Sequence, residues 1–259
     1  MKGTFDNLSR VFSNSTRLQI MYLLYEDSQT ITELTAKISN VSASVVSRHL
    51  SLLDEYNIID KKAVTSRNYE LSPFGESILR IMNPLTFFIK KSAYFKSHSL
   101  KSLPSNFLRN IDILDNAIFV EGTGSVMNEL TTNTSNIKHS IFYIASSHFL
   151  IPHYNYKEIR VIYPIWLYEQ LGVPKLREDI EKNTNLSPDD VHIRLLPEID
   201  VGVAIYDDYE KGIIVFPRND DKGLDYNGLF VIEDKTGMEY LKDIWTYYWN
   251  LSEPASLEL

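Results

Sequence analysis

The segment from Ser42 to Asn57 constrains the fold most strongly, because the two faces of the helix it predicts have opposite chemistry. Val46, Leu50 and Leu53 recur at the helical period and form an apolar stripe that needs a core. The opposite face carries short hydroxyls and one guanidinium, from Ser44, Ser47, Arg48 and Ser51. We interpret this small polar face as a surface that can approach a nucleic-acid duplex, where hydroxyls bind phosphates and arginine binds guanine or phosphate.

A second helix is predicted immediately before this segment. Thr30 and Glu33 have the spacing of a capping box, which starts a helix that reaches Ile38. Residues 39–40 form a tight turn, and Ser42 is placed to cap the helix that follows. The order of helix, short turn and helix is the one that lays a recognition helix into the major groove of DNA.

The flanking residues predict a larger unit around this pair of helices. The apolar segment from Thr16 to Tyr25 indicates a buried first helix. Residues 58–62 and 68–71 predict two short strands, joined by a polar tip at 64–67, which is the pattern of a wing. The pair Ser72-Pro73 is typical of a helix start, with serine as the N-cap and proline at the first helical position.

Three motifs carry a resemblance to a known family: Ser15-Thr16-Arg17-Leu18, Val46-Ser47-Arg48-His49-Leu50 and Ile58-Ile59. With them, residues 8–82 resemble the winged helix-turn-helix of the arsenic-repressor-like and related prokaryotic transcription regulators. Asn57 stands where the family usually has glycine, and asparagine is the next residue best able to adopt a left-handed conformation. The resemblance implies binding to double-stranded DNA, commonly by a symmetric homodimer that reads two half-sites.

The predicted DNA contacts lie on the second helix and the wing. We expect Arg48 to contact bases or phosphate, the serines to position the helix, and Arg67 to reach an adjacent groove or the backbone. His49 borders the apolar stripe, so it is either a contact or a packed core histidine. The alternative for the whole unit is a surface that binds protein instead of DNA. The predicted set is Ser42, Ser44, Ser47, Arg48, His49, Lys62 and Arg67.

The chain contains no cysteine, which excludes a thiolate metal sensor, disulfides and thiol redox sensing. We expect neither a metal nor a cofactor. No apolar run approaches the roughly 20 residues that a membrane span needs, and the first residues lack a signal-peptide core. The sequence therefore predicts a cytoplasmic protein that does not enter a membrane.

The net charge of −8 is unevenly placed along the chain. Residues 1–82 are balanced, whereas 83–103 contain four lysines and no acid, so the negative charge belongs to the residues that follow. This distribution argues against a protein that coats nucleic acid generally. It leaves room for a sequence-specific regulator with a focused positive face, for which the candidates are Arg48, Lys61, Lys62 and Arg67.

The length of 259 residues and the apolar content of 44% allow two domains with separate cores. We expect a winged helix-turn-helix over 1–82, a connecting helix over 83–103 and a sensor domain over 104–259. Asn83-Pro84 is predicted to break or kink the connecting helix, after which an apolar and aromatic pattern resumes. That apolar surface either forms part of a dimer seam or packs against the first domain.

Strands alternate with helices after about Leu103, which predicts an α/β domain with a mixed sheet. The fold class is therefore α/β with an N-terminal α+β winged helix. The expected helices cover 125–130, opened by Ser125, then 164–183 with an interruption at 172–174, and a final one carrying Trp245 and Trp249. The expected strands cover 117–121, 140–145, 158–163, 192–196, 201–206, 213–216 and 229–232.

Four stretches, residues 102–107, 203–208, 225–228 and 245–249, resemble the C-terminal part of archaeal regulators exemplified by the methanogenesis and filament-formation regulator. That domain is similar in shape to phospholipase-D-like folds and to sugar-sensing domains, which implies binding of a small-molecule effector without hydrolysis. Open α/β sheets bind ligands beyond their strand ends. Four aromatic residues near expected strand ends either line such a pocket or belong to the core: Tyr143, Tyr163, Trp166 and Tyr206.

An enzyme fused to a winged helix, acting as a phosphodiesterase, is the remaining alternative. Its chemistry needs a His-X-Lys pair in each half-site, but His192-Ile-Arg194 is a single copy with arginine in place of lysine. We interpret Gly122-Thr-Gly124 and Asp207-Asp208 as turns, and His148 and His153 as unrelated loop residues. The sequence therefore predicts no catalytic residue and a protein that is not an enzyme.

Overall fold

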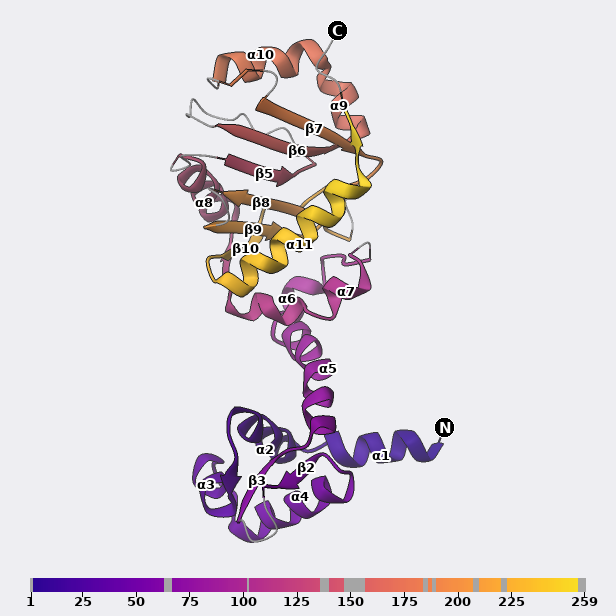
Figure 1. The fold of residues 1–259 in the computed structure, drawn as a ribbon, viewed down its shortest axis with the longest axis vertical. Helices are drawn as coiled ribbons and strands as arrows, with labels where there is room; N and C mark the ends of the chain where they lie inside the picture. The colour runs from indigo at the N-terminus through magenta and orange to yellow at the C-terminus, as the bar shows by residue number, and fades with distance from the viewer. Residues whose placement is uncertain are drawn as a thin grey trace. The chain divides into compact units, whose positions relative to one another are not determined.

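The computed structural model describes residues 2–62, 67–101, 103–135, 140–146, 157–183, 186–187, 190–206, 210–219 and 223–255. The chain forms two compact units, residues 1–85 and 86–259 (Figure 1). Helix α5, Pro73–Lys90, carries the chain from the first unit into the second.

The N-terminal unit combines helices with a three-stranded antiparallel sheet whose order is β1-β3-β2. The helices expected near 16–25, 30–38 and 42–57 and both wing strands are confirmed. Helix α1 and the two-residue strand β1 were not expected. The elements are α1 Lys2–Phe12, α2 Ser15–Glu26, β1 Gln29–Thr30, α3 Ile31–Lys37, α4 Ala43–Glu55, β2 Ile59–Lys61 and β3 Asn68–Leu71.

Local hydrogen bonds explain where these elements begin. The capping box of α3 is present: Thr30 Oγ1 accepts from the Glu33 amide at 3.2 Å, and the Glu33 carboxylate accepts from the Thr30 amide at 2.7 Å. Asn40 and Asn57 adopt the left-handed conformation, with φ of 59° and 56°. Ser42 occupies the N-cap position of α4, but its hydroxyl makes no capping bond and lies 2.9 Å from Ser44 Oγ. The expectation that Ser42 caps this helix was therefore wrong for its side chain.

The core of the N-terminal unit forms around α4, whose apolar stripe is buried as expected. Val46, Leu50 and Leu53 have almost no exposed surface. They share one cluster with side chains from α2, α3, the start of β2 and α5, including Ile20, Met21, Leu34, Ile59 and Leu79. Burial of such side chains contributes about 1.5–3 kcal/mol each, so this cluster determines which face of α4 remains outside.

Helix α5 does not break at Asn83-Pro84, so of the expected break or kink the break is wrong and the kink stays a prediction. Ser72 Oγ accepts from the Gly75 amide at 3.0 Å, and Pro73 is the first helical residue, as predicted. The helix then continues through Pro84 to Lys90. A proline removes one helical hydrogen bond, but packing of an apolar face outweighs that loss when the proline itself is buried, as Pro84 is.

The C-terminal unit contains an eight-stranded mixed sheet of order β11-β7-β6-β5-β8-β9-β10-β4. The parallel strands are β5, β6 and β7, and every other pairing is antiparallel, including the expected β8–β9 hairpin. Strand β11 was not expected. The bounds are β4 Ile118–Glu121, β5 Ser140–Ile144, β6 Glu158–Pro164, β7 Val191–Leu196, β8 Gly202–Tyr206, β9 Lys211–Val215, β10 Gly228–Ile232 and β11 Glu253–Pro254.

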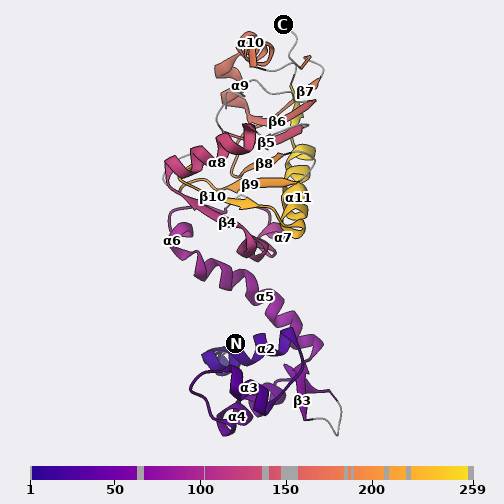
Figure 2. The same cartoon turned by 90° about the vertical axis from the view of Figure 1, so that its left-hand side faces the viewer.

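Helices cover both faces of this sheet, so its central strands are buried on both sides. Figure 2 shows α11 on one face, with α8 and α9 on the other. Gly172 ends α9 at the expected interruption, with φ of 73°. Helix α8 begins at Thr123 instead of Ser125, because the Gly122 carbonyl accepts from the Val126 amide. The bounds are α6 Ser92–Phe95, α7 Ser105–Leu108, the 3₁₀ helix η1 Ile111–Asn116, α8 Thr123–Ser135, α9 Ile165–Leu171, α10 Val173–Asn183 and α11 Lys235–Leu251.

Candidate functional site

Helix α4 presents its polar face to solvent because its apolar face is held in the core. Ser42, Ser44 and Arg48 are exposed, and Ser47 is half-buried. The Ser51 hydroxyl is not free, since it donates to the Ser47 carbonyl at 3.0 Å. The exposed face therefore offers short hydroxyls around one guanidinium, which is the chemistry that the sequence indicated.

His49 lies on the buried side of α4, with only 5% of its surface exposed. Its Nδ1 atom is 3.4 Å from a guanidinium nitrogen of Arg17, which is also buried. Arg17 donates from Nε to the Val11 carbonyl at 2.7 Å and from Nη2 to the Arg10 carbonyl at 2.5 Å. These bonds hold the end of α1 against α2 and α4. Because its side chain is enclosed, His49 fits the alternative of a packed core histidine and leaves the set of predicted DNA contacts.

Three arginines interact electrostatically beside α4. Burial and the nearby cations Arg17 and Arg48 lower the pKa of His49. Burial and the cations Arg10 and Arg48 likewise lower the pKa of Arg17. A neutral His49 thus lies within a positive field. The same field extends to the exposed Arg48, where a phosphate can complement it.

The lowered pKa of His49 predicts acid sensitivity in the N-terminal unit. The unfolded chain takes up a proton as pH falls through the ordinary value of 6.5, but the folded protein does so only at lower pH. The free energy of unfolding should therefore fall as pH drops below about 6.5, with no such contribution above it. Urea unfolding followed by circular dichroism at about pH 7.5 and about pH 5.5, chosen to bracket that value, measures the change. His49→Gln should lack this component, and equal pH dependence of both proteins would contradict the assignment.

The wing places further basic residues outside. Lys61, Lys62 and Arg67 are exposed. The Lys62 ammonium donates to Ser28 Oγ at 3.3 Å, and the Lys61 ammonium lies 6.0 Å from the centre of the Tyr69 ring. Of the tip expected at 64–67, residues 64–66 lie outside the described residues.

The aromatic residues suggested for an effector pocket do not line a common one. Tyr143, Tyr163 and Tyr206 are buried in the core of the C-terminal unit, whereas Trp166 is 51% exposed. The Tyr143 and Tyr163 hydroxyls are 2.8 Å apart, and burial raises the pKa of Tyr143 to about 12. Adjacent parallel strands bring Tyr143 and Tyr163 together, and the burial of all three tyrosines agrees with the alternative that they belong to the core.

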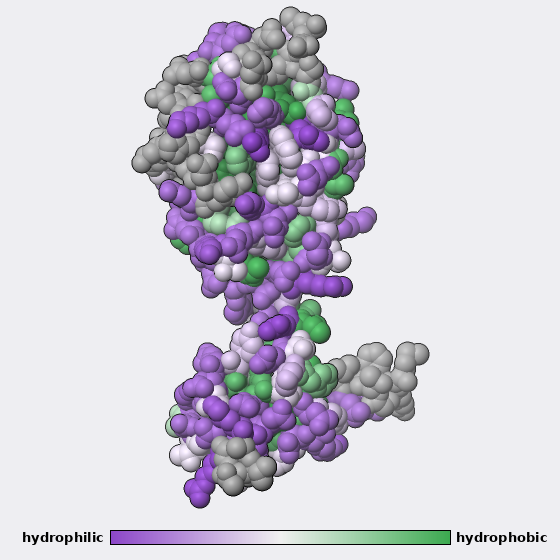
Figure 3. Space-filling view, viewed as in Figure 1, coloured by the Kyte–Doolittle hydropathy of each residue, from purple (hydrophilic) through white to green (hydrophobic). Residues whose placement is uncertain are grey.

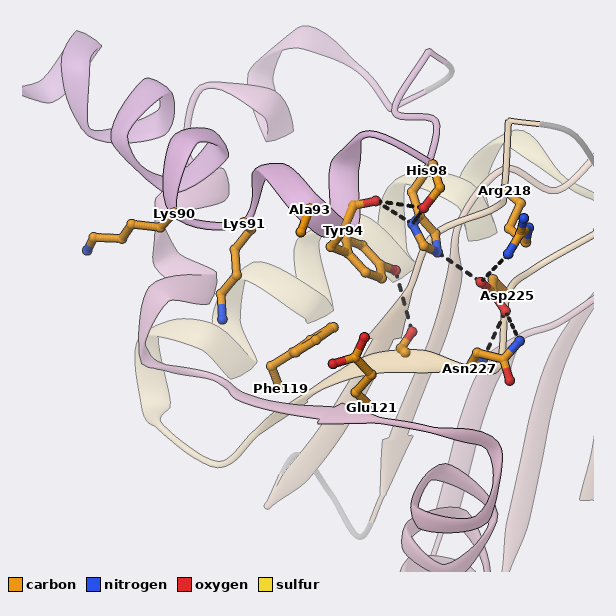
Figure 4. A pocket seen from close by; sticks show the side chains of 12 residues that line it. Lys90, Lys91, Ala93, Tyr94, His98, Phe119, Glu121, Arg218, Asp225 and Asn227 are labelled. Atoms are coloured by element: carbon orange, nitrogen blue, oxygen red, sulfur yellow. Dashed lines mark hydrogen bonds and ion pairs between the residues drawn. The ribbon is translucent and has the colours of Figure 1, made fainter.

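A hollow of about 420 Å³ lies elsewhere in the C-terminal unit, between the α5–α6 segment, strand β4, Arg218 and residues 225–228 (Figure 4). At one end His98 Nε2 is 3.1 Å from Asp225 Oδ2, and both side chains are buried. His98 Nδ1 is 2.6 Å from the Tyr94 carbonyl oxygen. The sequence reasoning missed this cluster. The stretch 225–228 was noted only for its resemblance to other regulators, and no spacing connects it with His98.

Residues 14–61 match the family described as bacterial regulatory protein, arsR family. This stretch is an arsR-type helix-turn-helix. No curated protein matches the chain. Two solved structures are similar to it at low identity. One is TrmBL2, an archaeal chromatin protein, at 14% identity and a TM-score of 0.39 over 96% of this chain and 98% of that one. The other is a transcriptional regulator of the MarR family from Enterococcus faecalis V583, at 19% identity and a TM-score of 0.33 over 37% of this chain and 92% of that one.

Two of the residues weighed for catalysis, His192 and Arg194, lie on strand β7 of the sheet. His192 Nε2 lies 3.4 Å from the Glu158 carboxylate, and Arg194 Nε donates to the Ser252 carbonyl at 3.1 Å. Gly122 forms the turn into α8. Asp207, Asp208, His148 and His153 lie outside the described residues. In the part of the chain that the structure describes, no helix is long and apolar enough to cross a membrane.

Proposed function

We propose that the protein is a transcription regulator that binds specific sites in double-stranded DNA, and that its C-terminal unit binds a small-molecule effector. The observation that carries the DNA-binding part is the exposed face of α4. Its hydroxyls and the Arg48 guanidinium point outward, while the opposite face is locked into the core. A helix held in this way presents a fixed set of side chains to a groove.

The proposed contacts are those predicted residues that remain exposed or half-exposed. Arg48 reads bases or phosphate, since its fork matches the two acceptors of guanine. The serines of α4 and the basic residues of the wing position the helix through the backbone. Because the whole chain is acidic, affinity depends on this local face and not on overall charge. The contact set is Ser42, Ser44, Ser47, Arg48, Lys62 and Arg67.

A gel shift with genomic fragments in excess competitor DNA tests this proposal. We expect the full-length protein to retain a small subset of fragments, and the double variant Arg48→Ala/Arg67→Ala to lose them. Arg80→Ala is the matched control, because Arg80 is an exposed arginine on α5 that pairs only loosely with Glu76, at 3.9 Å. Retention of the same fragments by the double variant would contradict these contacts, and a wild-type protein that retains no fragment would favour a unit that binds protein instead of DNA.

We propose further that the regulator acts as a homodimer through the exposed apolar face of α5. Ile81 and Leu85 are one helical turn apart and are 72% and 58% exposed, and Phe74 is exposed two turns earlier. Apolar side chains are visible along this helix in Figure 3. A second copy that covers the face would remove these side chains from water, which favours association at roughly 25 cal/mol per Å².

Replacing the apolar face of α5 should dissociate the dimer. We expect Ile81→Ser/Leu85→Ser to shift the protein to monomer in sedimentation equilibrium and to weaken binding to a palindromic site more than to a half-site. Ile118→Ser provides the control, because Ile118 is comparably exposed but lies on strand β4. A wild-type protein that is monomeric at every concentration would contradict the dimer, as would an unaffected double variant.

A further inference from the structure

The hollow of the C-terminal unit is built between the sheet and the segment that continues from α5. The Ser99 amide donates to the Pro217 carbonyl, and the Asn219 amide donates to the Ser97 carbonyl, both at 2.8 Å. These bonds fasten residues 97–99 to the end of β9. Lys91, the residue after the end of α5, faces strand β4 across the hollow.

The buried end of the hollow is already satisfied by its own contacts. Asp225 Oδ2 faces His98 Nε2, while its Oδ1 accepts from the Asn227 amide at 3.0 Å and from Asn227 Nδ2 at 2.9 Å. The Tyr94 ring stacks on the His98 ring with their centres 3.6 Å apart. These groups form a pre-organised wall, because they are held by contacts with one another.

The remaining walls carry two side chains of opposite charge, Lys91 and Glu121, and neither forms an ion pair with a described residue. The Lys91 ammonium lies 5.0 Å above the centre of the Phe119 ring and makes no ion pair with any described residue. The Glu121 carboxylate makes neither a hydrogen bond nor an ion pair within the described part of the chain. In Figure 4 the Glu121 carboxylate points into the hollow beside Phe119, and Lys91 reaches down toward the same ring. Lys90, in contrast, points away and pairs with Asp115.

We propose that this hollow binds a small zwitterion of the amino-acid class. The ligand carboxylate pairs with the Lys91 ammonium, and the ligand ammonium pairs with the Glu121 carboxylate. The Phe119 and Tyr94 rings contact its carbon skeleton. Pairs of this kind gain strength from the charges on both partners. The volume of about 420 Å³ lies in the range of small-ligand sites and is ample for one amino acid.

Such a ligand would bridge the end of α5 and strand β4, which gives the site a route to the DNA-binding unit. This consequence rests on the proposed function, whereas the binding site itself does not. If the ligand favours one arrangement of the α5–α6 segment, linkage requires that ligand and DNA change each other's affinity by the same factor.

Calorimetric titration of the full-length protein with the common amino acids at millimolar concentration tests the site. We expect at least one to bind, and its N-acetyl and carboxamide derivatives to bind at least about tenfold more weakly, equivalent to about 1.4 kcal/mol. Glu121→Gln should weaken binding of the free amino acid by a similar factor but leave binding of the N-acetyl derivative unchanged. Lys91→Gln should likewise weaken binding of the free amino acid but leave binding of the carboxamide derivative unchanged. Lys90→Gln is the matched control, and its affinity should equal that of the wild type.

Two results would overturn the site: no binding by any amino acid, or binding that neither Glu121→Gln nor Lys91→Gln weakens. Gel shifts in the presence of the amino acid that binds separate the proposed binding site from its proposed effect on DNA binding. Binding that depends on both residues but leaves DNA affinity unchanged upholds the site and contradicts its role as the effector site. DNA binding that is lost in Arg48→Ala/Arg67→Ala upholds the regulator independently of either result.

Discussion

Arg48→Ala is expected to weaken binding to the specific DNA site by about 1–3 kcal/mol, or roughly fivefold to more than a hundredfold. Arg48 supplies the only cation on the exposed face of α4, and the buried stripe of Val46, Leu50 and Leu53 prevents the helix from turning another side chain toward the groove. Arginine forks onto guanine or phosphate with two donors, and alanine replaces neither.

Titrations of a labelled specific duplex and an unrelated duplex at several salt concentrations measure this effect. Loss on the specific duplex alone indicates base reading, whereas equal loss on both, with a salt slope reduced by about one, indicates a phosphate contact. Arg48→Lys keeps the charge but not the forked pair of donors. Compared with Arg48→Ala, it should therefore restore affinity for the unrelated duplex more than affinity for the specific one. Arg80→Ala should match the wild type on both. Unchanged affinity in Arg48→Ala would contradict the orientation proposed for α4.

Gly75→Ala should destabilise the N-terminal unit by about 3 kcal/mol. A Cβ atom at this position of α5 would lie 2.0 Å from the Ile58 carbonyl oxygen, which is backbone and cannot rotate away. The same oxygen accepts from the Ser72 amide at 3.0 Å, so moving it also disturbs the junction of the wing with α5. The usual gain from alanine over glycine in a helix, about 0.4–1 kcal/mol, is too small to compensate.

Urea unfolding measures this change with an internal reference. All three tryptophans, Trp166, Trp245 and Trp249, belong to the C-terminal unit, so their fluorescence follows that unit. Circular dichroism follows helices of both units. We expect Gly75→Ala to move an early part of the dichroism transition to lower urea and to leave the fluorescence midpoint in place. Gly124→Ala is the matched control in helix α8, where a Cβ meets nothing within 4 Å. An unshifted dichroism curve for Gly75→Ala would contradict the close contact.

Local signals in the sequence predicted much of the backbone. The capping box at Thr30, the left-handed residue at Asn57, and Ser72-Pro73 at the start of α5 each act through groups within a few residues of one another. The same holds for the strand patterns of the mixed sheet. Pro84 shows where a local signal fails, because the helix continues through it and the packing of its buried side chains outweighs one missing hydrogen bond.

By itself, the sequence determined the helix-turn-helix, its exposed serine and arginine face, and the mixed α/β character of the remainder, because these follow from periodicity and short-range hydrogen bonds. Only the tertiary structure decided that His49 is enclosed with Arg17, and that Tyr143, Tyr163 and Tyr206 belong to the core. It also decided that His98 and Asp225, which are 127 residues apart in the chain, meet at the hollow. Burial and long-range pairing depend on which surfaces the strands and helices cover. No spacing within a single segment of the chain encodes that information.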